Sequence, residues 1–149
     1  MNEITRNTVH APVLPALDIE RNPHTEPFWE AAKEKRLAVP RCLECGRYSM
    51  PPKGFCSFCR SQDYEYVTLT GRATLYAYTV VRHAVTAALA DRVPYVLAVV
   101  KLPDADDLKM LTNIVECEEK EIEIGVQLRV VFHDQGDVTV PRFRPLTRT

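Results

Sequence analysis

The sequence predicts a mainly β protein, in which a helix and a metal-binding segment precede a small barrel of five strands. Two C-x-x-C pairs lie near the front of the chain, and five short apolar runs separated by turn residues follow them with little helical periodicity between them. The 149 residues suffice for one ordinary domain or two small ones. We expect an extended arm over residues 1–24, a helix and metal segment over 25–66, and a β domain over 67–149.

The arm is polar and interrupted by Pro12, Pro15 and Pro23. It has too little apolar surface to offset the entropy of ordering its backbone, so we expect it to be disordered in the isolated protein. Its scattered apolar residues support a second interpretation, in which the arm lies along a partner chain. These residues are Val9, Val13, Leu14, Leu17 and Ile19.

A helix is expected from about Thr25 to Arg36. Thr25 is a suitable N-cap residue, and Pro27 falls in the first turn, where its missing N–H has no consequence. Phe28 and Trp29 belong to the apolar face of this helix. Trp29 is the single tryptophan, and it is expected either to pack on the neighbouring domain or to anchor a partner chain. Phe28 and Trp29 are therefore candidate partner-binding residues.

The segment from Arg41 to Gln62 contains little apolar material, so it needs another source of stability. A tetrahedral ion that joins the two C-x-x-C turns supplies it, and four thiolates at about 2.3 Å suit zinc. The candidate ligands are Cys42, Cys45, Cys56 and Cys59. Glycine follows the first pair, where a tight turn often requires a positive φ, but arginine follows the second. Because four protein thiolates leave no position for water, the predicted zinc is structural.

Three other interpretations of these cysteines remain. Two disulfides would suit a secreted chain, but no charged region followed by an apolar run precedes them. A redox-active C-x-x-C pair would need a helix that starts beside a strand, and two pairs so close together fit that poorly. Iron in a rubredoxin-type site uses the same four ligands as zinc.

The remaining sequence predicts strands at about residues 72–82, 94–102, 110–117, 128–132 and 138–143. The run at 94–102 is nearly continuous, which is typical of a strand buried on both faces. Five short strands with little helix between them favour a small barrel, with the OB-fold as the leading candidate. A sandwich usually needs about seven strands, for which the chain is too short.

A succession of short motifs covers most of the chain. They read PFWEAAK at 27–33, RCLECG at 41–46, CSFC at 56–59, GRATLYAYTVV at 71–81, PYVLA at 94–98, LTNI at 111–114, IGV at 124–126 and PRFRP at 141–145. Their order and spacing resemble the DUF35 family of acyl-CoA-associated proteins. In that family a rubredoxin-like zinc ribbon precedes an OB-fold, so the resemblance implies this architecture here.

The resemblance also implies a role. Members of the family are small subunits of thiolase-like complexes, whose partners include acetyl-CoA acetyltransferases, ketothiolases, sterol-side-chain aldolases and phloroglucinol-type acyltransferases. We therefore expect a non-catalytic accessory subunit that binds a thiolase-like catalytic subunit and can bridge it to a third, synthase-like subunit. The resemblance further implies a CoA ester shared with the partner, which would carry the nucleophilic cysteine.

The residues themselves also favour a non-catalytic chain. Cys117 is the single cysteine outside the two pairs, and Glu116, Glu118, Glu119 and Glu121 surround it in the sequence. Negative neighbours raise the pKa of a thiol, so a nucleophilic role is disfavoured and a buried Cys117 is expected. The four histidines are dispersed, with no two at helix-turn spacing, and are expected at the surface; they are His10, His24, His83 and His133.

Two further places are candidate binding sites. The connection at 84–93 is unusually apolar, and it is expected either to cover one end of the barrel as a short helix or to dock on a partner through Val85 and Leu89. Arginines also end the first and last barrel strands. If those strands are neighbours, Arg82, His83, Arg142 and Arg144 would form a patch for the phosphates of CoA.

A single-stranded nucleic-acid-binding OB-fold is the alternative function. Tyr76 and Tyr78 are expected on one face of the first barrel strand, as base stacking would require. However, 19 basic residues against 20 acidic ones provide no excess charge for binding phosphates. No apolar run approaches the roughly 20 residues of a membrane span, so we expect a cytoplasmic protein without membrane contact.

Overall fold

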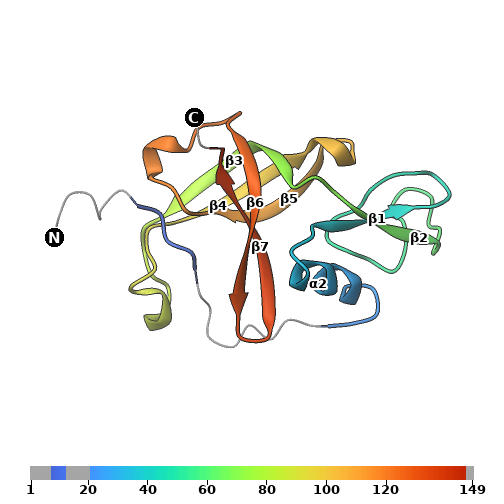
Figure 1. Cartoon of the computed structure of the whole chain (residues 1–149), viewed down its shortest axis with the longest axis horizontal. Helices are drawn as coiled ribbons and strands as arrows, with labels where there is room; N and C mark the ends of the chain where they lie inside the picture. The colour runs from blue at the N-terminus through green and yellow to red at the C-terminus, as the bar shows by residue number, and fades with distance from the viewer. Residues whose placement is uncertain (1–7, 13–20, 147–149) are drawn as a thin grey trace.

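A computed structural model describes residues 8–12 and 21–146 (Figure 1). One helix, α2 (Glu26–Lys33), and a two-stranded sheet, β1 (Ala38–Cys42) and β2 (Tyr64–Thr68), form the N-terminal part. Five strands follow: β3 (Arg72–Val81), β4 (Tyr95–Leu102), β5 (Leu108–Ile114), β6 (Gln127–Gln135) and β7 (Val138–Pro145). Single 3₁₀ turns at Ala87–Leu89, Pro103–Ala105 and Glu119–Glu121 lie in the connections. The predicted mainly β fold class is confirmed.

Helix α2 begins after Thr25, as predicted, but it ends at Lys33 rather than at Arg36. Lys35 adopts a φ of 60°, and the N–H groups of Lys35 and Arg36 donate to the carbonyls of Ala32 and Ala31. This pattern is a Schellman motif with lysine at the position that glycine usually occupies. It reverses the chain, so that Leu37 leads directly into β1.

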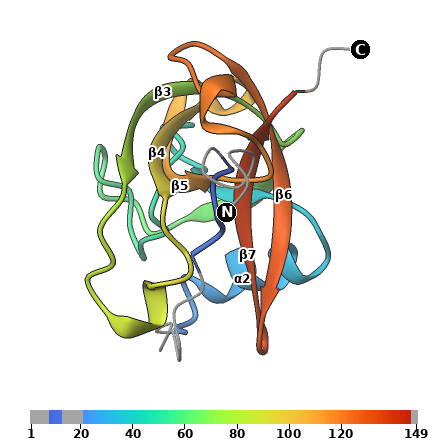
Figure 2. The same ribbon diagram turned by 90° about the vertical axis from the view of Figure 1, so that its left-hand side faces the viewer.

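The five C-terminal strands close a barrel in the order β3-β4-β5-β7-β6, with β6 pairing back to β3. All neighbours are antiparallel except β5 and β7, which are parallel and pair at one position. Figure 2 shows β3, β4 and β5 on one side of the barrel and β6 and β7 on the other. Fully buried side chains from all five strands fill its interior, among them Leu75, Val100, Ile114, Leu128 and Phe143. The predicted five-stranded, OB-like barrel is confirmed.

The prediction that residues 94–102 are buried on both faces is wrong. Burial alternates along β4, so that Val96, Ala98 and Val100 face the core while Leu97 is 39% exposed. A barrel strand has one inner and one outer face, and the apolar residues of the outer face mimic a doubly buried strand in the sequence.

Tyr76 and Tyr78 do not share a face, contrary to expectation. A β-bulge lies between Leu75 and Ala77, and it shifts the alternation of side chains by one residue. Tyr76 lies against Lys101 on the outside, whereas Tyr78 is the cross-strand partner of Ala98, which is buried in the core. The paired aromatic surface that base stacking would need is therefore not formed by these two residues.

Residues 8–12 are placed against the barrel, so the prediction of a disordered arm is wrong for this stretch. Val9 is buried and its N–H donates to the carbonyl of Cys117, while the N–H of His10 donates to the carbonyl of Pro94. The buried guanidinium of Arg142 donates to the carbonyl of Pro12 at 2.6 Å. These contacts join distant segments, which composition alone does not reveal. Val13, Leu14, Leu17 and Ile19 lie outside the described residues.

Within residues 8–12 and 21–146, no helix is long and apolar enough to cross a lipid bilayer.

Candidate metal centre and partner-binding surface

The four cysteines lie on two turns with the same backbone hydrogen bonds. In the first turn, the N–H of Gly46 donates to the carbonyl of Cys42 at 3.0 Å, and the N–H of Cys42 donates to the carbonyl of Arg47 at 2.8 Å. In the second turn, the N–H of Arg60 donates to the carbonyl of Cys56 at 2.9 Å, and the N–H of Cys56 donates to the carbonyl of Ser61 at 2.8 Å. Each C-x-x-C pair therefore forms the same loop, and β1 and β2 hold the two loops together.

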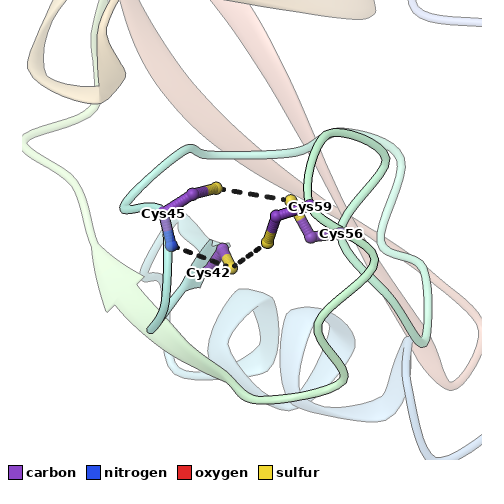
Figure 3. A group of neighbouring side chains, drawn as sticks. All are labelled: Cys42, Cys45, Cys56 and Cys59. Carbon is purple, nitrogen blue, oxygen red and sulfur yellow. Dashed lines mark hydrogen bonds between the residues drawn. The ribbon is translucent and has the colours of Figure 1, made fainter.

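The sulfur atoms of both loops point toward one another (Figure 3). All four Sγ atoms lie within 4.8 Å of each other, with Cys42 to Cys59 and Cys45 to Cys56 each separated by 3.5 Å. Four ligands at about 2.3 Å from a tetrahedral ion are about 3.8 Å apart. A disulfide would bring two sulfurs to about 2.05 Å, and all of these cysteines are free thiols. The arrangement fits one tetrahedral metal ion.

The electrostatics of the donor set also fit a cation. Backbone N–H groups of Cys59 and Phe58 lower the pKa of Cys56 to about 6, and those of Cys45 and Glu44 lower the pKa of Cys42. The N–H of Ser61 lowers the pKa of Cys59, but burial and the neighbouring sulfurs outweigh it and raise that pKa to about 12. Four thiolates so close together repel one another unless a cation lies between them. When bound there, zinc would join the two loops.

Each loop has a positive φ directly after its second cysteine, 76° at Gly46 and 66° at Arg60. A side chain disfavours this conformation, so we expect Gly46→Ala to destabilise the ribbon by about 1 kcal/mol. A Cβ on Gly46 would meet only the guanidinium of Arg41, at an ordinary 3.5 Å, so the cost lies in the backbone conformation. Arg60→Gly should be neutral or stabilising. Thermal unfolding of the zinc-loaded proteins tests these two substitutions. Equal effects of Gly46→Ala and Arg60→Gly on stability would contradict the explanation by backbone conformation.

Comparison with known proteins identifies the chain. Residues 29–65 match the family model "ChsH2, rubredoxin-like zinc ribbon domain", and residues 66–133 match "ChsH2, C-terminal OB-fold domain". A DUF35 domain-containing scaffold protein of Methanothermobacter thermautotrophicus is 31% identical over 97 residues, which cover 64% of this chain and 71% of that protein. The chain belongs to the DUF35 family.

Two further similarities concern larger assemblies. A solved structure described as "Ltp2-ChsH2(DUF35) aldolase" superposes with a TM-score of 0.73 and 32% identity, covering 89% of this chain and 98% of that chain. A probable enoyl-CoA hydratase alpha subunit of Thermomonospora curvata is 35% identical over 120 residues, 79% of this chain. The DUF35 chain spans only 36% of the length of that protein. The predicted DUF35 resemblance and zinc ribbon are confirmed, and the ribbon with its clustered thiols supports a structural zinc.

The four candidate partner-binding residues differ in accessibility. Phe28 is buried and packs edge-on against Trp29, and Leu89 is buried in the turn between β3 and β4. Both side chains therefore stabilise this chain itself. Trp29 is partly exposed, and Val85 is 74% exposed beside the turn. Trp29 and Val85 stay as predictions for partner contacts.

The proposed patch for CoA phosphates required neighbouring strands, and this condition is not met. Strand β6 lies between β3 and β7 in the barrel. Arg82 forms an ion pair with Glu119 at the end of β3, and His83 is exposed there. Arg142 is buried, where it contacts His133 and the carbonyl of Pro12, and Arg144 is half-buried on β7. Arg82 and Arg142 thus serve local contacts, and the condition for the predicted patch is not met.

Cys117 is buried, as predicted, and Val9 is hydrogen-bonded to its carbonyl. Burial raises the pKa of Cys117 to about 12, and Glu121 and Glu118 add to this effect. At neutral pH a group with a raised pKa stays a neutral thiol, which is a poor nucleophile. We expect a thiol reagent to modify the four ribbon cysteines after chelation of zinc, and Cys117 only after denaturation. Rapid titration of all five thiols in the native, chelated protein would contradict this.

An apolar groove lies where the ribbon meets the barrel, and sequence reasoning missed it. It encloses about 340 Å³ between helix α2, the Met50-Pro51-Pro52 turn and the β5 and β7 strands. The lining residues are Thr25, Phe28, Trp29, Met50, Pro51, Pro52, Met110, Leu111, Thr112, Asn113, Val140 and Pro141. The one signal in the sequence was the helix with Phe28 and Trp29, because the other walls come from three distant segments.

Proposed function

We propose that this DUF35 chain is a non-catalytic accessory subunit of a thiolase-type acyltransferase or aldolase complex. The observation that carries the proposal is the similarity, over 89% of this chain, to a DUF35 chain whose structure is described together with an aldolase. The relative named a scaffold protein supports the same role. In this proposal the partner carries the catalytic nucleophile and acts on a CoA ester.

The chemistry of the described residues supports a non-catalytic role. The zinc-ligand set is complete with four thiolates, so no position is left for an activated water. Cys117 is a buried, neutral thiol. Among residues 8–12 and 21–146, no other cysteine is available as an acyl-transfer nucleophile. The contribution of this chain would be to hold and complete its partner, and to bridge it to a third, synthase-like subunit.

Co-expression with the neighbouring genes, followed by purification through a tag on this chain, tests the proposal. We expect a thiolase-type protein to co-purify in fixed stoichiometry, and its turnover of acyl-CoA to depend on the DUF35 chain. Turnover of acyl-CoA by the isolated chain would overturn the non-catalytic role. A chain that purifies alone and binds single-stranded DNA, with an affinity that falls steeply with salt, would instead support the nucleic-acid alternative.

A further inference from the structure

The barrel is closed between β5 and β7 by a short seam. These parallel strands pair only at Ile114 and Phe143, where the N–H of Val115 donates to the carbonyl of Phe143 at 2.9 Å. In the parallel pattern the N–H of residue 141 would donate to the carbonyl of Leu111. That residue is Pro141, which has no N–H, so the ladder stops there.

Strand β5 therefore has an unpaired edge beside the groove. On its other side it pairs with β4 at seven consecutive positions, from Leu108 to Ile114. Backbone groups alternate in direction along a strand, and the bond from Val115 shows that odd-numbered residues direct theirs toward the seam. The hydroxyl of Thr112 donates to the carbonyl of Pro141 at 3.4 Å across the seam, next to the single strand pair. The N–H and C=O of Leu111 face the seam beyond this bond, where β5 and β7 have no further pair. Unpaired edges of this kind accept an added strand.

The side chains around this edge form an apolar and uncharged wall. Leu111 is 64% exposed, although it lies in the middle of a strand. Across the groove stand Trp29 on α2 and the Pro51-Pro52 turn. None of the residues that line the groove carries a charge. An exposed leucine in a concave, apolar setting favours an apolar occupant.

Lys109 stands at the outer end of the same edge, and Lys101 faces it from the neighbouring strand β4. Lys109 is directly opposite Lys101 across the β4–β5 pair, and both ammonium groups approach the ring of Tyr76, at 4.4 Å and 4.9 Å from its centroid. Like charges at directly opposite positions destabilise a sheet. Within the described parts of the chain, neither lysine forms an ion pair with a carboxylate. A carboxylate from outside would relieve this repulsion.

We propose that the edge of β5 at residues 109–111 accepts an extended segment of the catalytic partner as an added β-strand. The segment would be apolar where it faces Leu111 and Trp29, and it would carry an aspartate or glutamate beside Lys109. This inference rests on the proposed function, because it names the surface by which the partner is held. The backbone bonds would give affinity, and the groove and lysines would select the sequence.

A matched pair of surface variants tests the proposal in the reconstituted complex. Leu111→Glu places a charge in the groove, and we expect it to weaken binding of the purified partner by roughly 30-fold or more. Ile124→Glu is the control, because Ile124 is similarly exposed, at 59%, but lies in the turn before β6. It should leave binding unchanged. Circular dichroism verifies that both variants fold.

Residue-resolved amide exchange distinguishes an added strand from a purely apolar contact. In the isolated chain, the N–H of Leu111 should exchange much faster than those of Met110 and Thr112, which face β4. In the complex, the N–H of Leu111 should become protected. Lys109→Glu should also weaken binding, and more strongly at low salt than at high salt. The introduced carboxylate repels the acidic residue of the bound segment, and low salt screens this repulsion less.

The outcomes separate this inference from the proposed function. If no partner binds the wild-type chain, both fail. If the partner binds wild type and Leu111→Glu equally, or the N–H of Leu111 stays unprotected in the complex, the inference is overturned and the accessory role stands. Loss of a dimer of this chain on Leu111→Glu, with partner binding intact, would assign the seam to a second copy. Protection by an acyl-CoA alone would assign it to a small ligand.

Discussion

Replacing Cys42 with serine is expected to abolish zinc binding, to unfold residues 41–63 and to eliminate complex formation. Structural zinc contributes on the order of 10 kcal/mol or more to the folding of such small modules. The ribbon has little apolar surface of its own, and both loops depend on the shared ion. The buried core of the barrel also includes Phe28, Leu37 and Val39, but no buried member of it lies in residues 41–63. The barrel should therefore remain folded, and a two-dimensional NMR spectrum would lose ribbon resonances while it keeps those of β3 to β7. Chelation of zinc should reproduce the same pattern in the wild-type chain.

The fifth cysteine provides the control for this experiment. Cys117→Ala removes a thiol outside the ribbon, and it should leave one zinc ion per chain. Metal content can be measured by atomic emission on the purified proteins, and complex formation by size-exclusion chromatography with the partner. An unchanged zinc content and an intact complex in Cys42→Ser would refute the assignment of the ligands.

Gly71→Ala is expected to destabilise the barrel by about 2 to 4 kcal/mol. Gly71 precedes β3 at the junction with the ribbon, has a φ of 85°, and accepts a hydrogen bond from the N–H of Val130 at 2.8 Å. A Cβ at this position would lie 2.5 Å from Cγ1 of Val130, so the substitution combines backbone strain with a steric overlap. Chemical denaturation of the zinc-loaded chain measures the effect.

Gly125→Ala separates the two contributions. Gly125 has a nearly identical φ of 89°, but a Cβ there would meet nothing within 4 Å. We therefore expect a loss of only about 1 kcal/mol, which is the cost of the left-handed conformation alone. Val130→Ala should partly rescue Gly71→Ala, because it removes the overlapping methyl group; the double variant would then be less destabilised than the sum of the single ones. Equal losses at both glycines, or strict additivity with Val130→Ala, would contradict the steric explanation.

Local sequence patterns predicted the ribbon and the number of barrel strands. The two C-x-x-C pairs identify the ligands directly, because each pair lies on one short loop. The backbone hydrogen bonds of that loop join residues that are four or five positions apart. Alternating runs predicted strands because the period of two is intrinsic to the pleat. Even the irregular second loop follows the pattern, since Arg60 takes the positive φ that glycine takes in the first.

Other features depend on residues that are distant in the sequence. The bulge at Tyr76 is a property of the pairing between β3 and β4, and a pattern read along β3 alone places Tyr76 and Tyr78 on one face. Val9 has a buried position only because Cys117 and Pro94 present their carbonyls to residues 9 and 10. Arginine is a residue type that usually lies at the surface, where it can bind anions. Arg142 is instead buried, and its guanidinium contacts the carbonyl of Pro12 and the ring of His133.

The sequence by itself determined the metal ligands and the order of ribbon and barrel, because these follow from local spacing and alternation. Its succession of motifs also resembled the DUF35 family closely enough to predict membership. Only the tertiary structure decided which faces are exposed and where the barrel ladder is interrupted. Pro141 has no N–H to donate to β5, a strand almost 30 residues earlier, so the carbonyl of Leu111 has no backbone donor from β7. Strand pairing between distant segments sets the direction of each backbone group and side chain, and no local pattern carries that information.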